Sequence, residues 1–137
     1  MNDFSSIKVL GVGSWGKVML VRHKKSQDLF AMKVIKRSKI KTPKEVEHQK
    51  TELRILERIV HPFIVQLKYA FHDKKKLFLV LSYCPGGELF FYLNACKRFK
   101  ENVVSFYCSN ILLALKCLHE NNIVYRDLKP ENILIDL

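Results

Sequence analysis

The chain has 137 residues, of which 48% are hydrophobic and 27% charged, and a net charge of +11. This length allows one ordinary domain with a core of its own. The sequence contains no internal repeat, no low-complexity tract and no apolar stretch long enough to span a membrane. The first residues form no apolar signal run, and Asn2 stands where N-myristoylation needs a glycine. We therefore expect a soluble, cytoplasmic protein without integral membrane association.

The positive charge is concentrated in the first part of the chain. Through Cys84 there are 18 Lys and Arg against 7 Asp and Glu, and from Pro85 onward the two counts are 6 and 6. A basic surface can bind nucleic acid, anionic lipid or an acidic partner. The lysines are scattered over expected strands and turns, without a recognition helix or interleaved aromatic residues. We interpret them as a solvated basic face and expect no nucleic-acid partner; binding of nucleic acid or anionic lipid is an alternative that a steep salt dependence would mark.

The cysteines give no sign of a metal site or a disulfide framework. Cys84, Cys96, Cys108 and Cys117 form no C-x-x-C pair and have no ordered histidine partners. We expect free thiols in a reducing compartment.

The first part of the chain alternates short β-rich runs with turn residues. The expected strands are residues 7–10, 18–22, 29–35, 64–71 and 77–81. A helix between the third and fourth strands has a well-marked start, with Thr42 as N-cap, Pro43 at the first helical position and Glu45 closing a capping box. It should end near residue 60, because His61-Pro62 follows.

The segment Pro85-Gly86-Gly87 is expected to be a hinge between two parts. Helices are predicted at residues 88–95 and 102–120, followed by a loop and a short strand at 133–135. The longer helix is apolar around nearly its whole circumference, as expected for a helix surrounded by other elements. Exposing about five of its apolar side chains would forgo on the order of 10 kcal/mol. We therefore expect further protein to cover this helix.

Residues 11–18 form a glycine-rich segment that can be interpreted in several ways. It satisfies the dinucleotide-binding pattern G-x-G-x-x-G and nearly satisfies the phosphate loop G-x-x-x-x-G-K-[ST]. Both patterns need a helix directly afterwards, whereas residues 18–21 favour a strand, and Val18 replaces the metal-binding hydroxyl of the phosphate loop. A glycine loop between two strands, with Val18 beneath a nucleotide base, is the third interpretation. From this segment alone, an ordinary glycine hairpin stays open.

A lysine inside an apolar strand gives the second clue. Lys33 interrupts residues 30–35, which otherwise look like core, and a lysine there is costly unless paired. On the marked helix, Glu52 shares a face with Ile55 and Leu56. We expect a buried Lys33 to pair with a buried Glu52, which would hold the ammonium toward nucleotide phosphates. Two solvated surface groups are the alternative.

Residues 125–132 read Tyr-Arg-Asp-Leu-Lys-Pro-Glu-Asn. They match the catalytic loop of eukaryotic protein kinases, in which the Asp positions a hydroxyl nucleophile and the Asn five residues later holds a metal. With the glycine loop and the Lys33–Glu52 pair, residues 4–137 resemble serine/threonine protein kinases, most closely the AGC group related to cyclic-nucleotide-dependent, C-type and S6-directed kinases. Tyr125 in place of the usual His, together with residues 83–90, carries the AGC resemblance. Lys129 favours Ser/Thr over Tyr substrates.

The resemblance implies an α+β, protein-kinase-like fold. Residues 1–84 would form a small lobe with a five-stranded antiparallel sheet, one helix, the glycine loop and the hinge. Residues 85–137 would form the start of an α-rich large lobe and end after the catalytic loop. The implied cofactors are ATP and Mg²⁺. The implied partners are a protein substrate with a Ser or Thr near basic residues and an activating kinase or docking partner.

The resemblance also implies individual roles around ATP. Gly11, Gly13 and Gly16 would cover the phosphates, and Lys33, held by Glu52, would contact them. The adenine and the ribose would be contacted by the side chains or backbone of Leu10, Val18, Ala31, Leu81 as gatekeeper, Ser82, Cys84, Glu88 and Glu131.

The catalytic loop would carry the chemistry. By the resemblance, Asp127 would orient the substrate hydroxyl and accept its proton, Lys129 would steady the γ-phosphate, and Asn132 would bind Mg²⁺. His48 and Arg126 match positions that grip an activation-loop phosphate in such kinases.

In the family, the chain continues into Asp-Phe-Gly, whose Asp chelates the main Mg²⁺, and then into an activation loop. These segments are not among the 137 residues. Because phosphoryl transfer depends on positioning and on metal neutralising phosphate charge, we expect little or no transfer by this chain alone. The alternative function is a non-catalytic ATP-binding or docking module.

Overall fold

The computed structural model describes residues 3–13 and 15–136, so that Asn2 and the glycine-loop residue Ser14 lie outside the described part. The chain forms two compact units. The N-terminal unit consists of Met1–Val60 and Val65–Tyr83, and the C-terminal unit consists of His61–Ile64 and Cys84–Leu137. Among the described residues, no helix combines the length and the apolar character needed to cross a bilayer.

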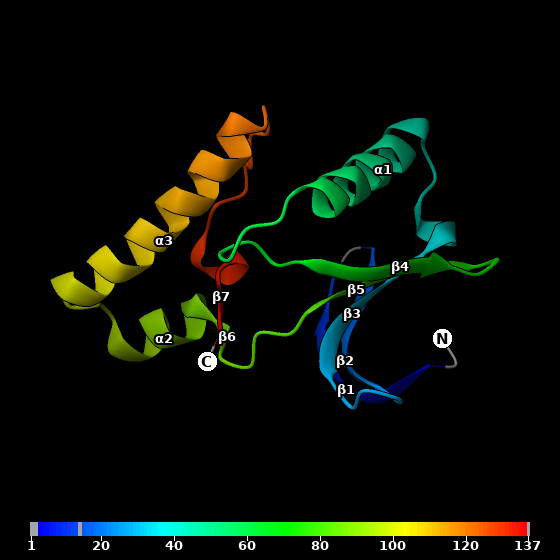
Figure 1. Ribbon diagram of the computed structural model, residues 1–137, viewed down its shortest axis with the longest axis horizontal. Coiled ribbons are helices and arrows are strands. Elements are labelled where there is room, and N and C mark those ends of the chain that lie inside the picture. Colours follow the sequence, from blue (N-terminus) through cyan, green and yellow to red (C-terminus); the bar gives the residue numbers. More distant parts are fainter. Residues whose placement is uncertain (1–2, 14, 137) are drawn as a thin grey trace. The chain divides into compact units, whose positions relative to one another are not determined.

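The N-terminal unit is built on a five-stranded antiparallel sheet (Figure 1). In spatial order its strands are β1 (Phe4–Val12), β2 (Gly16–His23), β3 (Leu29–Lys36), β5 (Lys76–Ser82) and β4 (Leu67–His72). This sheet confirms the predicted α+β, protein-kinase-like fold class, and each of the five predicted strands is present. The prediction was wrong about the start of the fourth strand, because Ile64 belongs instead to a turn in which its N–H donates to the His61 carbonyl at 3.1 Å.

One face of the sheet carries the hydrophobic core. Alternating residues of β2, β3 and β5 point to this face, as the two-residue period of a strand requires. The buried cluster consists of Val21, Met32, Val34, Phe78 and Val80. Phe4 on the edge strand β1 stacks on Phe71 of the opposite edge strand β4, with ring centroids 6.1 Å apart. The sheet is therefore curled enough for its two edges to share an aromatic contact.

The helix α1 (Pro43–Arg58) begins as the sequence predicts. The Glu45 N–H donates to Thr42 Oγ1 at 3.2 Å, and the Thr42 N–H donates to the Glu45 carboxylate at 2.9 Å, which completes the capping box. A short 3₁₀ helix, η1 (Arg37–Lys39), precedes α1 and was not predicted.

A cavity of about 280 Å³ lies beside α1. Its apolar lining comes from Ile40, Val46, Leu53 and Leu77, and its remaining lining residues are Arg37, Gln49, Lys50 and His72. The side-chain oxygen of Gln49 is buried and has no hydrogen-bond partner among the described residues.

The described residues of the C-terminal unit form three helices and one small sheet. The helices are α2 (Leu89–Cys96), α3 (Glu101–Glu120) and the 3₁₀ helix η2 (Pro130–Asn132). The strands β6 (Gly87–Glu88) and β7 (Leu134–Ile135) pair antiparallel. The predicted helices and last strand are present, but β6 was not predicted. Gly87 was expected in the hinge and Glu88 at the start of the first helix, which begins instead at Leu89. A Cβ at Gly86 would approach the Ile135 carbonyl oxygen to 2.7 Å, so glycine permits this close pairing.

The helix α3 presents a large apolar surface. Phe106 and Leu112 are 61% and 64% exposed, and only Leu118 is fully buried within the helix. The expectation that further protein covers α3 stays a prediction. The four cysteines are free thiols, of which Cys96 and Cys108 are exposed.

Candidate active site

The register of the N-terminal sheet gathers four of the predicted nucleotide-site residues on one face. Lys33 on β3 lies opposite Val18 of β2, and Ala31, two residues earlier, lies opposite Leu81 of β5. Residues directly opposite each other in an antiparallel sheet share a face, as do residues two apart on one strand. Val18, Ala31, Lys33 and Leu81 therefore line the face opposite the Val21–Met32 core. This arrangement offers an apolar platform with one ammonium at its end.

Lys33 is joined to α1 by an ion pair. Its Nζ lies 2.6 Å from the Glu52 carboxylate oxygen, within hydrogen-bond distance. The expected pair is present, but the expectation that both groups are buried was wrong, since the side chains are 27% and 37% exposed. Long charged side chains keep their heads near water while their stems lie along apolar surface. The partly exposed ammonium is thus fixed in position and still accessible to a ligand.

The three loop glycines differ in their surroundings. Around Gly11 and Gly13, an added Cβ would meet no atom within 4 Å, whereas a Cβ at Gly16 would come within 1.8 Å of the Val34 carbonyl oxygen. Hydrogen bonds join Gly13 and Gly16 in both directions, at 2.9 and 3.3 Å, and the Lys36 N–H donates to the Trp15 carbonyl at 3.2 Å. Gly16 is therefore required by close packing of β2 on β3. Gly11 and Gly13 leave open backbone that phosphates can approach.

The remaining predicted residues of this unit lie on β1, β5 and α1. Leu10 on β1 is 40% exposed. The Ser82 N–H donates to the Gln66 carbonyl at 2.9 Å, so this N–H is not available to a ligand. His48 is exposed on α1.

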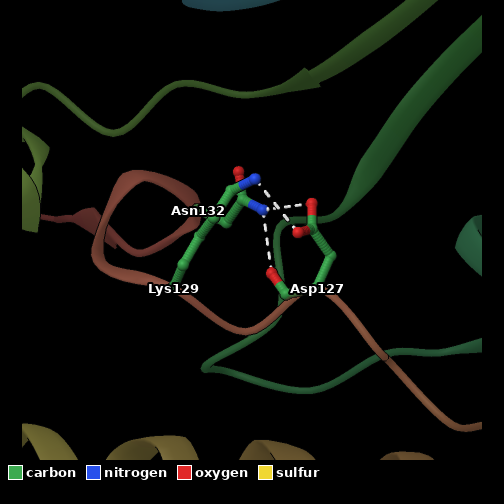
Figure 2. A network of polar contacts seen from close by, with 3 residues as sticks. All are labelled: Asp127, Lys129 and Asn132. Carbon is green, nitrogen blue, oxygen red and sulfur yellow. Dashed lines mark hydrogen bonds and ion pairs between the residues drawn. The ribbon is translucent and has the colours of Figure 1, made fainter.

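The catalytic-loop residues form a compact polar network in the C-terminal unit (Figure 2). Lys129 Nζ lies 3.0 Å from one Asp127 carboxylate oxygen, and Asn132 Nδ2 donates to the other at 2.7 Å. Asn132 Nδ2 also donates to the Asp127 backbone carbonyl at 2.9 Å. Both side chains therefore point toward Asp127, and the three predicted catalytic and metal-site residues of this loop are brought together.

Backbone conformation explains how residues so near in sequence converge. Arg126 has φ of 62°, in the left-handed region that costs a non-glycine residue about 1 kcal/mol or more. Pro130 then begins η2, whose first turn is closed when the Asn132 N–H donates to the Lys129 carbonyl at 2.9 Å. The tight turn returns Asn132 to Asp127. Such strain is common at functional sites.

The network fixes the charge states of its members. The hydrogen bonds from Lys129 and then from Asn132 lower the pKa of the Asp127 carboxyl below its ordinary value. The same contact with Asp127 raises the pKa of Lys129. Burial raises the pKa of the Tyr125 hydroxyl, and the nearby Asp127 charge adds to this shift. Asp127 is therefore an anion and Lys129 a cation throughout the neutral range.

The donor set of this loop fits Mg²⁺ held together with phosphates. Since Asn132 turns its Nδ2 toward Asp127, its Oδ1 is left as a metal ligand, and Mg²⁺ prefers oxygen. Within residues 3–13 and 15–136, no cluster of three or more His, Cys, Asp or Glu could hold a metal by itself. Proteins commonly bind Mg²⁺ through one or two side chains plus substrate phosphates. The residues fit a shared site of that kind.

Two further predicted residues lie close to this loop in sequence or in the small sheet. Glu88 on β6 is paired with Leu134 on β7, and Glu131 lies in the first turn of η2. Cys84 precedes this sheet, and its carbonyl accepts from the Gly87 N–H at 3.3 Å. Leu134, the partner of Glu88 in this sheet, is 43% exposed.

Comparison with known proteins identifies the family. The protein kinase domain family matches residues 4–137. The chain is 52% identical over 135 residues to Protein kinase 2 of Dictyostelium discoideum. It is 48% identical over 136 residues to serine/threonine-protein kinase akt-2 of Caenorhabditis elegans, and 47% identical over 136 residues to the cAMP-dependent protein kinase catalytic subunit of Schizosaccharomyces pombe. These matches cover 98%, 99% and 99% of this chain.

The chain therefore belongs to the protein kinase domain family, and its similar relatives are AGC-type serine/threonine kinases. It spans 28%, 26% and 27% of the length of the three relatives named above. Protein kinases use ATP and Mg²⁺ to phosphorylate proteins.

Proposed function

We propose that the protein containing this chain transfers the γ-phosphate of ATP to a Ser or Thr hydroxyl of a protein substrate. The observation that carries the proposal is the Asp127–Lys129–Asn132 network, in which a charged carboxylate, a cation and an amide meet on one turn. The Lys33–Glu52 pair supports it from the other unit. The match of residues 4–137 to the protein kinase domain supports the same activity.

The N-terminal unit would bind the nucleotide. Val18, Ala31 and Leu81 offer an apolar surface for the adenine, and Leu10 on β1 would add to it. The backbone of Ser82 would hydrogen-bond the adenine edge. Three residues of the C-terminal unit would complete the site, Cys84 at the adenine edge and Glu88 and Glu131 at the ribose. Gly11, Gly13 and Gly16 would cover the phosphates, and Lys33 would neutralise part of their charge while Glu52 holds it in place.

The C-terminal unit would position the substrate hydroxyl. The Asp127 carboxylate would accept a hydrogen bond from that hydroxyl and take its proton as the phosphoryl group is transferred. Lys129 would steady the γ-phosphate, and Asn132 would hold Mg²⁺ through Oδ1. Bound Mg²⁺ supplies neutralisation of the phosphate charge. We also propose that the protein prefers substrates with basic residues near the target Ser or Thr.

The same residues allow a second function for a short native product. With one metal-binding amide and no Asp-Phe-Gly among its 137 residues, the isolated chain is expected to bind ATP and to transfer phosphate poorly. The alternative is therefore a non-catalytic ATP-binding or docking module. ATP binding without turnover in the native protein would favour it.

We also propose that an activating kinase or docking partner acts on the N-terminal unit through α1. The cavity beside α1 has an apolar lining and a basic rim, and the buried Gln49 oxygen has no partner among the described residues. Glu52 lies on the same helix. An occupant of the cavity would steady α1 and with it the Lys33–Glu52 pair.

ATP binding can be measured through the single tryptophan of the chain. Trp15 lies between Gly13 and Gly16, so its fluorescence should change when Mg²⁺-ATP binds to the 137-residue chain. We expect a saturable change with ATP and a smaller one with ATP in Lys33→Met. If ATP at millimolar concentration produced no saturable change, the nucleotide site would be refuted.

A further inference from the structure

Two segments of the N-terminal unit bring five cations to one end of the sheet. Lys36 and Arg37 end β3 and begin η1, and Lys74, Lys75 and Lys76 form the turn into β5. We call these five residues the lysine cluster. In the sequence they are separated by a helix and a strand, so the folded sheet creates their proximity.

The pairing of β3 with β5 joins the two segments directly. Lys36 lies opposite Lys76 in the register of the two strands. The Arg37 N–H donates to the Lys75 carbonyl at 2.9 Å, and the Arg37 guanidinium donates to the Asp73 carbonyl at 3.5 Å. The backbone thus holds the cluster together despite the repulsion between its charges.

Asp73, which directly precedes Lys74, forms no ion pair with these cations among the described residues, although the Lys76 charge acts on it. The Asp73 carboxylate accepts from the Lys75 and Lys76 backbone N–H groups at 2.7 and 2.6 Å, which shapes the turn. These bonds lower the pKa of Asp73 below its ordinary value. Among the described residues, the ion pairs of this unit are Lys33–Glu52 and Arg54–Glu47, and neither includes a member of the cluster.

Like charges placed directly opposite each other destabilise a sheet. The Lys36–Lys76 pair therefore opposes the β3–β5 pairing that the hydrophobic core favours. Lys36, Arg37, Lys74 and Lys75 are exposed, and Lys76 is half-buried, so an external anion could reach the cluster. An external anionic surface would remove this repulsion.

We propose that the lysine cluster is a docking surface for an anionic membrane. Four of its five cations are lysines, which act as hydrated point charges, whereas arginine forks suit bidentate recognition of single phosphates. Clusters of about four to eight basic residues attract the anionic headgroups of lipid bilayers. Docking to an anionic membrane is a function separate from phosphoryl transfer and does not depend on it.

The test uses the full 137-residue chain and vesicles of phosphatidylcholine with about one-third phosphatidylserine. The first variant carries Lys74→Gln, Lys75→Gln and Lys76→Gln. The matched control carries Lys97→Gln, Arg98→Gln and Lys100→Gln, because these three exposed cations form an equally dense group in the C-terminal unit. Circular dichroism verifies that each variant is folded. A second cluster variant, Lys36→Gln with Arg37→Gln, is used if the first does not fold.

Cosedimentation is expected to show binding to the anionic vesicles and not to pure phosphatidylcholine vesicles. The first variant should bind about 100-fold more weakly, from about fivefold for each lysine near the surface. The control should bind within about threefold of the unchanged chain, and binding should weaken as salt rises.

Three results would overturn the proposal. One is equal vesicle binding by the first variant and the unchanged chain, and another is an equally large loss in the control. The third is no vesicle binding while a single-stranded oligonucleotide or a poly-glutamate peptide binds in a cluster-dependent way, which would assign the surface to that class of macromolecule.

Discussion

Lys33 on β3 and Glu52 on α1 form an ion pair with 2.6 Å between the ammonium nitrogen and a carboxylate oxygen. The pair joins the sheet face that carries Val18, Ala31 and Leu81 to the helix beside it. Because both side chains are partly exposed, the pair contributes little to stability through solvent-screened attraction. Its consequence is positional, since it fixes one ammonium where nucleotide phosphates would lie.

Replacing Lys33 by Met should therefore weaken ATP binding and leave the fold intact. A charge-assisted contact is worth about 1.5–3 kcal/mol, which corresponds to an affinity loss of roughly 10- to 100-fold. The measurement is a titration of Trp15 fluorescence with Mg²⁺-ATP. Lys68→Met is the control, because Lys68 on β4 is exposed and, within the described part of the chain, its ammonium donates only to nearby Gln66. Equal affinities in Lys33→Met and the unchanged chain would contradict the assigned role.

The two kinds of loop glycine should respond differently to alanine. Gly16→Ala brings a Cβ against the Val34 carbonyl and should destabilise the fold by about 3 kcal/mol. Gly13→Ala meets open space and should keep the melting temperature while weakening ATP binding. Thermal unfolding followed by circular dichroism, together with the Trp15 titration, separates the two effects. Unfolding of both variants to the same extent would show that Gly13 is structural as well.

The charge of Asp127 should respond to its two neighbours. Its pKa is lowered because Lys129 and Asn132 donate to the carboxylate. A lowered pKa means that these contacts favour the folded loop above the ordinary carboxyl pKa, and that this preference is lost as pH falls through the lowered value. Carbon-13 NMR titration of the Asp127 carboxyl should show a rise in pKa in Lys129→Met and a smaller rise in Asn132→Leu. An unchanged pKa in both variants would mean that the network does not persist in solution.

Replacing Gln49, whose side-chain oxygen is buried, should stabilise the fold. Replacing it by Leu removes an unpaired buried acceptor and should raise stability by about 1 kcal/mol, a few degrees in melting temperature. Gln66→Leu is a matched control, because the Gln66 oxygen already accepts from Lys68 at 2.8 Å and should not benefit from removal. A lower melting temperature for Gln49→Leu would indicate that the amide is satisfied in solution.

The sequence predicted the elements whose signals are local. Thr42, Pro43 and Glu45 predicted the start of α1, because a capping box is formed by neighbouring residues. Short β-rich runs bounded by turn residues predicted β2, β3 and β5. The early part of β1 was missed, since Ser5 and Ser6 have no strand signal and are held by pairing with Arg22 and Val21 of β2.

The parts that the sequence could not predict depend on contacts between distant residues. The helical period of the sequence places Glu52 on one face of α1, but it does not determine how deeply that face is buried. The exposure of the Lys33–Glu52 pair was therefore not predicted. The strand β6 exists only because Gly87 and Glu88 pair with β7. The catalytic-loop motif predicted Asp127 and Asn132 as site residues. Their direct hydrogen bond was not predicted, because it depends on the left-handed backbone of Arg126.

The most direct test of the proposed function is transfer of labelled γ-phosphate by the native protein isolated from its source cells. The substrate is a Ser peptide with basic residues upstream of the Ser. The unchanged protein is compared with the Asp127→Asn variant, expressed at the native level. We predict labelled phosphoserine from the unchanged protein and a loss of roughly 100-fold or more in the variant, in which the proton acceptor is gone. Unchanged transfer by Asp127→Asn, or ATP binding without any transfer by the native protein, would contradict the account.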